Sequence, residues 1–482
     1  MSGTLLSSGI FLWFALGSLL SWYARRRTGA GVPEYFLANR TVGGLVSALS
    51  YSATTYSAFM MVGLVGLTYK TGVAALGFEL TYLIFTVFLL VLFAPRYWAA
   101  GRAFNLVSPS EFLSFRYSRS SVGFVATCLC MVMLIPYASV QLMGVGYLLE
   151  ILSGGSVPFC VGAGAGTLIG MVFCLAGMRS VAWTDSLQST IMLVASVVLV
   201  GFVSSRLLPQ GFVDAVSQVP ELLTVNWSPS LYLGLTLPWA FFAVTNPQVV
   251  QRLYTPEGPK SLRRMILGFS GFGLAYTLIC GLLGLAVALL RPGLDNADNA
   301  MPVLLSMVPT PLALIVTVSI VAAAVSTLNS IVLTLGSMFG RDVIRPLHPG
   351  LSEEDELRMG RAMIPAVSLA CFVFAQFRFD LIVVLSSLAS GGLLMQLPAV
   401  LGAFFWRRST AWGALSSLIV GGTVVTWLSL AGLKPLGQWP AIWGLTASGA
   451  VFVTVSLVTA PPQGRDAFFT GLNREMEGRF QL

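Results

Sequence analysis

The most conspicuous shortage in this sequence is charge. Only 10% of the 482 residues are charged, whereas 56% are hydrophobic. A soluble domain has about 25% charged residues, so most of this chain does not face water. The longest loops, near 96–119, 206–228 and 341–358, are too short for a soluble domain. We therefore predict a multi-pass protein of the plasma (inner) membrane, with the lipid bilayer as a partner and no nucleic acid.

Histidine is also scarce, and the cysteines do not have the spacing of a binding site or a disulfide framework. His348 is the only histidine, and the six cysteines lie in apolar spans without metal-site or disulfide-framework spacing. The sequence also lacks a carboxylate pair or a nucleophile motif that would support catalysis. We therefore expect no enzyme activity, no cofactor, and no metal ion other than a transported one.

Apolar runs, in contrast, are abundant, and many approach the roughly 20 residues that a helix needs to cross the hydrocarbon core. They predict an all-α protein with about thirteen transmembrane helices. The predicted spans are 5–24, 42–67, 75–95, 120–151, 157–177, 184–205, 229–251, 264–290, 309–338, 359–377, 381–406, 411–431 and 438–459. The first span is not a cleavable signal, because its basic residues follow the apolar core instead of preceding it.

Basic residues divide unequally between the two sets of alternate loops. One side receives 22 of the 27 Lys and Arg residues, including Arg252, and the other receives five. Cytoplasmic loops carry the excess of Lys and Arg. The division therefore predicts an extracellular N-terminus and a cytoplasmic C-terminus.

The span count permits an inverted repeat of two five-helix units, 42–205 and 229–407, which would have opposite orientations because five is odd. The remaining predicted parts are an extra helix with a cytoplasmic loop (1–41), an extracellular loop (206–228), and two helices with a cytoplasmic tail (408–482). The first helix of each unit is interrupted. Span two carries seven hydroxyl residues among Ser50–Ser57, and span seven carries Pro238 and then Asn246-Pro247-Gln248.

A second polar group lies in span nine. Ala323, Ser326 and Thr327 are three and four residues apart, so they share one helix face. Carbonyl and hydroxyl oxygens on such a face suit Na⁺, although a contact between helices through small residues would explain the same pattern.

Acidic residues are few within the predicted spans, where an ionisable residue suggests function, and two of them are candidates. Glu79 lies near the outer start of span three and could instead be an interfacial residue near Lys70 or Arg291. Asp185 lies near the inner start of span six and could cap a helix, hold a second cation or accept a proton.

Several segments together resemble the sodium:solute symporter family over nearly the whole chain. They are Glu34–Arg40 with the following Gly-Gly pair, Ser52–Phe59 with Gly63 and Gly66, Ser108–Tyr117, Gly177–Arg179 with Trp183, Asp185 and Gln188, Ser326-Thr327 before Arg341-Asp342, and Phe405-Trp406 before Gly413-Ala414. The resemblance implies a LeuT-like core of five plus five helices, preceded by one helix and followed by two. It also implies alternating access, in which sodium and a small organic solute move together. It further implies that a monomer is sufficient for transport.

The resemblance also implies site residues. The conserved sodium site falls on the carbonyls of Ala53, Tyr56 and Ala323 and the hydroxyls of Ser326 and Thr327. A second sodium site, present in some relatives, falls on Asp185, Ser326, Asn329 and Ser330, with Asn329 in place of a serine.

The solute is expected beside the break in span two, against spans three, four, seven and eleven. The candidate contacts are Thr54, Ser57, Glu79, Tyr137, Gln141, Trp239, Asn246 and Gln396. Resemblance to the pantothenate, proline and monocarboxylate branches favours a carboxylate-bearing solute. A proton-coupled transporter of the same fold, or a sodium symporter for sugars or polyols, is the alternative.

Overall fold

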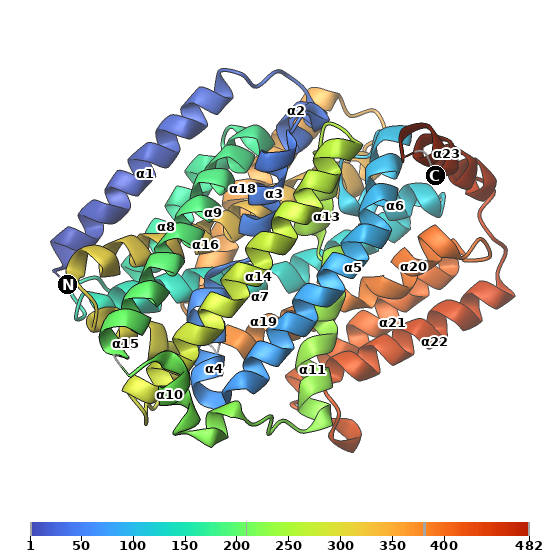
Figure 1. Cartoon of the computed structure of the whole chain (residues 1–482). Helices are drawn as coiled ribbons and strands as arrows, with labels where there is room; N and C mark the ends of the chain where they lie inside the picture. Colours follow the sequence, from blue (N-terminus) through green and yellow to red (C-terminus); the bar gives the residue numbers. More distant parts are fainter. Residues whose placement is uncertain (1, 209, 379–381, 481–482) are drawn as a thin grey trace.

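The computed structural model describes residues 2–208, 210–378 and 382–480, and this part of the chain is built from helices (Figure 1). The α-helices are α1 Gly3–Arg25, α2 Val32–Leu37, α3 Gly44–Thr55, α4 Val65–Thr71, α5 Val73–Ala103, α6 Pro109–Arg116, α7 Ser120–Leu152, α8 Phe159–Cys174, α9 Gly177–Phe202, α10 Phe212–Ser217, α11 Pro229–Ala240, α12 Phe242–Thr245, α13 Pro247–Leu253, α14 Pro259–Leu290, α15 Ala300–Ser306, α16 Thr310–Met338, α17 Arg345–Leu347, α18 Glu353–Ala375, α19 Ile382–Leu393, α20 Leu397–Phe405, α21 Ala411–Leu430, α22 Pro440–Val458 and α23 Arg465–Phe480.

Ten helices in the described ranges are long and apolar enough to cross a membrane. A further apolar helix, α8, has 16 residues. The two remaining predicted spans are the interrupted ones, which the structure builds from several short helices. Each of the thirteen predicted spans thus has a helical counterpart, although residue 381, the predicted start of span eleven, lies outside the described residues.

Both predicted interruptions are present. Helix α3 ends at Thr55, and the backbone at Tyr56 is extended (φ −95°, ψ 108°) before a π-helical turn begins at Phe59. In span seven, Asn246 is extended in the same way (φ −93°, ψ 112°) between α12 and α13. Extended residues inside a span leave backbone carbonyls free to face another partner.

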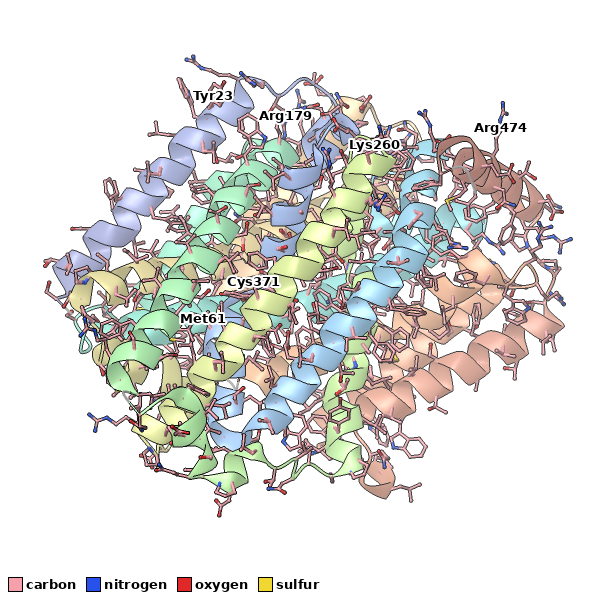
Figure 2. The ribbon with its side chains drawn as sticks, in the orientation of Figure 1. Tyr23, Met61, Arg179, Lys260, Cys371 and Arg474 are labelled. Atoms are coloured by element: carbon pink, nitrogen blue, oxygen red, sulfur yellow. The ribbon has the colours of Figure 1, made fainter. Side chains whose placement is uncertain are left out.

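The two ends of the chain lie at opposite ends of the helix bundle (Figure 1). Gly3 contacts Ser156, in the connection between α7 and α8. The last helix, α23, packs through Phe480 against Trp98, near the other end of α5, with ring centroids 5.6 Å apart. Figure 2 shows Arg179, Lys260 and Arg474 along this second end, whereas Met61 and Cys371 lie between the helices.

Two arginines that the charge count places among loop residues are instead buried. Arg116 is 0% exposed and donates to the carbonyls of Ala403 and Trp406, which joins α6 to the end of α20. Arg252 is 2% exposed and belongs to α13. A buried arginine requires specific partners, and those of Arg252 lie in the candidate functional site.

Candidate functional site

The break in span two faces the polar stretch of α16. The hydroxyl of Ser326 donates to the carbonyl of Ala53 at 2.8 Å and to that of Ala323 at 2.9 Å. The hydroxyl of Thr327 donates to the carbonyls of Ala53 and Thr54 at 3.3 and 3.4 Å. Four of the five predicted sodium ligands are therefore brought together where α3 ends.

Small side chains permit this close approach. Ala322, Ala323 and Ala324 are at most 1% exposed, and they precede Ser326 and Thr327 on a helix that is buried along most of its length. Short side chains let two helix backbones approach until a hydroxyl on one reaches a carbonyl on the other. The alternative interpretation, a contact between helices through small residues, is therefore present in the structure, and the sodium site at the same residues stays a prediction.

Tyr56, the fifth predicted sodium ligand, is the residue at which α3 ends. Its ring stacks on Phe269 and Phe272 of α14, with centroids 5.6 and 5.9 Å apart. The ring thereby fixes the position of the extended residue, whose backbone carbonyl no longer continues the helix. The arrangement is compatible with the predicted carbonyl ligand at Tyr56.

Asp185 lies eight residues inside α9, so it does not cap that helix. It is 0% exposed, and its Oδ2 accepts from the hydroxyl of Ser50 at 2.7 Å and from Nη2 of Arg252 at 3.3 Å. Asp185 therefore connects α9 to the broken spans two and seven.

Arg252 is a residue of this site that the sequence patterns did not indicate. It contacts Asp185 and Ser330, two members of the predicted second sodium site, and also Thr54, which was predicted to bind the solute. The hydroxyls of Thr54 and Ser330 lie 2.8 Å apart, so Thr54 belongs with the groups around Arg252. The one feature of the sequence that could have indicated a buried role for this arginine is its position, five residues after the Asn246-Pro247 break and next to apolar residues.

Asn329 lies on a different side of α16. With its amide nitrogen toward the nearby acceptors, it donates to the carbonyls of Gly170 and Val325 at 3.0 and 3.1 Å. The backbone carbonyl of Asn329 accepts a hydrogen bond from the thiol of Cys174, 3.5 Å away. Asn329, a residue of the predicted second sodium site, therefore packs α16 against α8.

Glu79 is 2% exposed, which is inconsistent with an interfacial carboxylate. Among the described residues, no hydrogen-bond partner is found for its Oε1. Glu79 interacts electrostatically with Tyr56, Tyr82 and Tyr137. An unpaired buried carboxyl oxygen among tyrosines is a candidate acceptor for a polar ligand.

Aromatic rings continue from Glu79 toward span seven. The ring of Trp239 lies 5.8 Å from that of Tyr82 and 6.1 Å from that of Tyr137, and it stacks on Phe242. The indole N–H of Trp239 donates to the hydroxyl of Ser387. The structure thus brings together Glu79, Tyr137 and Trp239, three of the predicted solute contacts.

The other predicted solute contacts bind protein groups to different extents. Gln396 donates to the carbonyl of Thr245 at 2.9 Å, and Gln141 donates weakly to the carbonyl of Tyr137 at 3.4 Å. Asn246 accepts from Thr245, and Ser57 accepts from the N–H of Phe59. Within the described part of the chain, no partner is found for Tyr137 Oη, Gln141 Oε1 or Asn246 Nδ2.

Comparisons with known proteins match this chain to a family and to individual relatives. Residues 35–421 match the model of the sodium:solute symporter family. The chain is 28% identical over 458 residues to the sodium/pantothenate symporter of Escherichia coli (strain K12), covering 90% of this chain and 92% of the relative. It is 27% identical over 476 residues to the osmoregulated proline transporter OpuE of Bacillus subtilis (strain 168), covering 95% of each.

A solved structure shows the same fold. The substrate-bound, outward-open state of a Na⁺-coupled sialic acid symporter superimposes with a TM-score of 0.82 at 16% identity, covering 95% of this chain and 98% of that one. The predicted LeuT-like helical architecture is thereby confirmed.

Proposed function

Because the chain belongs to the sodium:solute symporter family, we propose that this sodium-coupled symporter imports a small carboxylate-bearing solute, with pantothenate and proline as the first candidates. The observation that carries the coupling is the convergence of Ser326 and Thr327 on the carbonyl of Ala53. A monovalent cation at this point would bridge the break in span two to α16. Sodium binding would thereby fix the backbone beside which the solute binds.

The polar groups near the break support a solute with two kinds of polar group. Glu79 offers an acceptor, while Tyr137 Oη and Asn246 Nδ2 can donate. Proline presents an ammonium and a carboxylate, and pantothenate presents hydroxyls and a carboxylate. A monocarboxylate without a hydroxyl or an ammonium group would leave the carboxylate of Glu79 unpaired, at a cost in affinity.

Transport by this arrangement follows alternating access. Sodium enters from outside, the solute binds beside the broken helices, and the site then closes outward and opens inward. Moving one charge through 100 mV supplies about 2.3 kcal/mol. One sodium per neutral solute therefore supports roughly hundredfold accumulation at about 120 mV, before the sodium gradient itself is counted.

Proteoliposomes containing the full chain test this proposal. An inward sodium gradient should drive uptake of radiolabelled pantothenate or proline, and replacing sodium by potassium or choline should abolish it. A panel of short monocarboxylates and sugars serves as the comparison. Uptake driven equally well by a pH gradient without sodium would establish proton coupling instead, and preferential sugar uptake would contradict the carboxylate proposal.

The orientation that we propose from the charge distribution, with the N-terminus outside and the C-terminus in the cytoplasm, is tested by labelling single cysteines. Ser217 and Glu354 are exposed and lie on opposite sides of the predicted topology. In a variant without the exposed native Cys160, Ser217→Cys should react with an impermeant maleimide on intact cells. Glu354→Cys should react only after permeabilisation. The reverse result would invert the topology.

A further inference from the structure

Every nitrogen of the buried Arg252 guanidinium has a partner. Nε donates to the hydroxyl of Thr54 at 3.2 Å, and Nη1 contacts the sulfur of Met178 at 2.7 Å. Nη2 contacts Asp185 Oδ2 at 3.3 Å and Ser330 Oγ at 2.6 Å. These partners come from α3, α9 and α16, so the side chain of Arg252, on α13, reaches into the centre of the helix bundle.

Two of the residues predicted for a second sodium site, Asp185 and Ser330, are among the groups that surround this guanidinium. The carboxylate of Asp185 and the hydroxyls of Thr54 and Ser330 contact the guanidinium directly. The hydroxyl of Ser330 also donates a hydrogen bond to the carbonyl of Ser326 at 2.9 Å. The positive charge of Arg252 already balances the negative charge of Asp185. A sodium ion at the same oxygens would compete with the guanidinium for them and would be repelled by it.

We infer that the guanidinium of Arg252 is a tethered cation that takes the place of a second sodium ion, so that one sodium ion accompanies each solute. This inference rests on the proposed function and extends it to the stoichiometry. Arg252 acts here as a positioning residue: it holds Asp185, Thr54 and Ser330 in the arrangement that a bound cation would otherwise impose. The sodium ion bound at Ser326 and Thr327 is then the only ion that must enter and leave.

Equilibrium binding of radioactive sodium to the purified full chain tests the inference without knowledge of the solute. The unsubstituted chain should bind one ion with a Hill coefficient near 1. Binding of two ions per chain would overturn the inference while leaving sodium coupling intact. Binding of none would overturn the proposed function, and the inference with it.

Substitutions at Arg252 test whether the guanidinium excludes the second ion. Arg252→Gln removes the charge beside Asp185 and should raise the count to two ions, with a Hill coefficient above 1. Arg252→Lys keeps the charge and should bind one. Adding Asp185→Asn to Arg252→Gln removes the carboxylate and should return the count to one. A single ion in correctly folded Arg252→Gln would contradict the exclusion.

A matched control is available on the same helix as Asp185. Arg179 donates to Glu34 at 3.0 Å in another arginine–carboxylate pair, outside the oxygen cluster. Arg179→Gln should leave the count at one ion. Thermal unfolding of each variant establishes that it is folded, and the count for the unsubstituted chain decides the stoichiometry even if Arg252→Gln does not fold.

Discussion

Replacing Ser326 and Thr327 together by alanine is expected to lower sodium affinity by about 100-fold or more and to reduce sodium-driven uptake to background. Both hydroxyls converge on the carbonyl of Ala53. A polar contact with a charged group contributes about 1.5–3 kcal/mol, so two contacts contribute about 3–6 kcal/mol. Each 1.4 kcal/mol corresponds to about a tenfold change in affinity. Sodium titration of the initial uptake rate measures the effect.

The same helix provides the control for this double substitution. Thr317 and Ser319 are also buried on α16, but their hydroxyls donate to carbonyls of the preceding turn, Ala313 and Val316. Replacing both by alanine should change the sodium affinity by less than about threefold. If the Ser326→Ala, Thr327→Ala variant keeps its sodium dependence, the assigned ion site is wrong.

Glu79→Gln is expected to weaken solute binding by about 10- to 100-fold while sodium binding persists. The substitution preserves the shape of the side chain but replaces the buried carboxyl group near Tyr56, Tyr82 and Tyr137 by an amide. A hydrogen bond between the solute ammonium or hydroxyl and a carboxylate is stronger than one to an amide. The loss should therefore appear in the KM for proline or pantothenate, measured at saturating sodium.

The control here is Glu150→Gln, because Glu150 pairs with Arg378, 3.5 Å away, at the partly exposed end of α7. This change should leave the KM within about twofold. Unchanged or tighter solute binding by Glu79→Gln would show that the carboxylate does not accept a hydrogen bond from the solute. Tighter binding would point instead to a solute whose carboxylate lies beside Glu79 and is repelled by it.

The parts of the site that could be predicted depend on local patterns. Thirteen apolar spans follow from composition, and the breaks at Tyr56 and Asn246 follow from hydroxyl, proline and amide residues inside two of them. The spacing of Ala323, Ser326 and Thr327 places them on one face whatever they contact. These features require only the residues of a single helix.

The role of Arg252 could not be predicted in this way. Its carboxylate partner is 67 residues earlier in the chain and on another helix, and the charge count assigns any arginine at the end of a span to a loop. The contacts of Asn329 could not be predicted for a similar reason, because its hydrogen bond to Gly170 depends on how α8 packs against α16. Pairings between helices are set by tertiary packing, and the pattern within one helix does not contain them.

The hydrogen bonds of Ser326 and Thr327 also bear on how quickly the proposed sodium ion could leave the carrier. Each hydroxyl donates its hydrogen toward Ala53, whereas a sodium ion needs the oxygen lone pairs and the same carbonyl. Entry of the proposed ion would therefore exchange one set of bonds for another, with the hydroxyl of Ser326 able to turn fully to the carbonyl of Ala323. Because departure of the ion would restore the bonds between the helices, these bonds would offset part of the free energy of sodium binding. A carrier that must release its ion in every cycle would benefit from this offset, since a site that binds sodium more tightly would slow turnover.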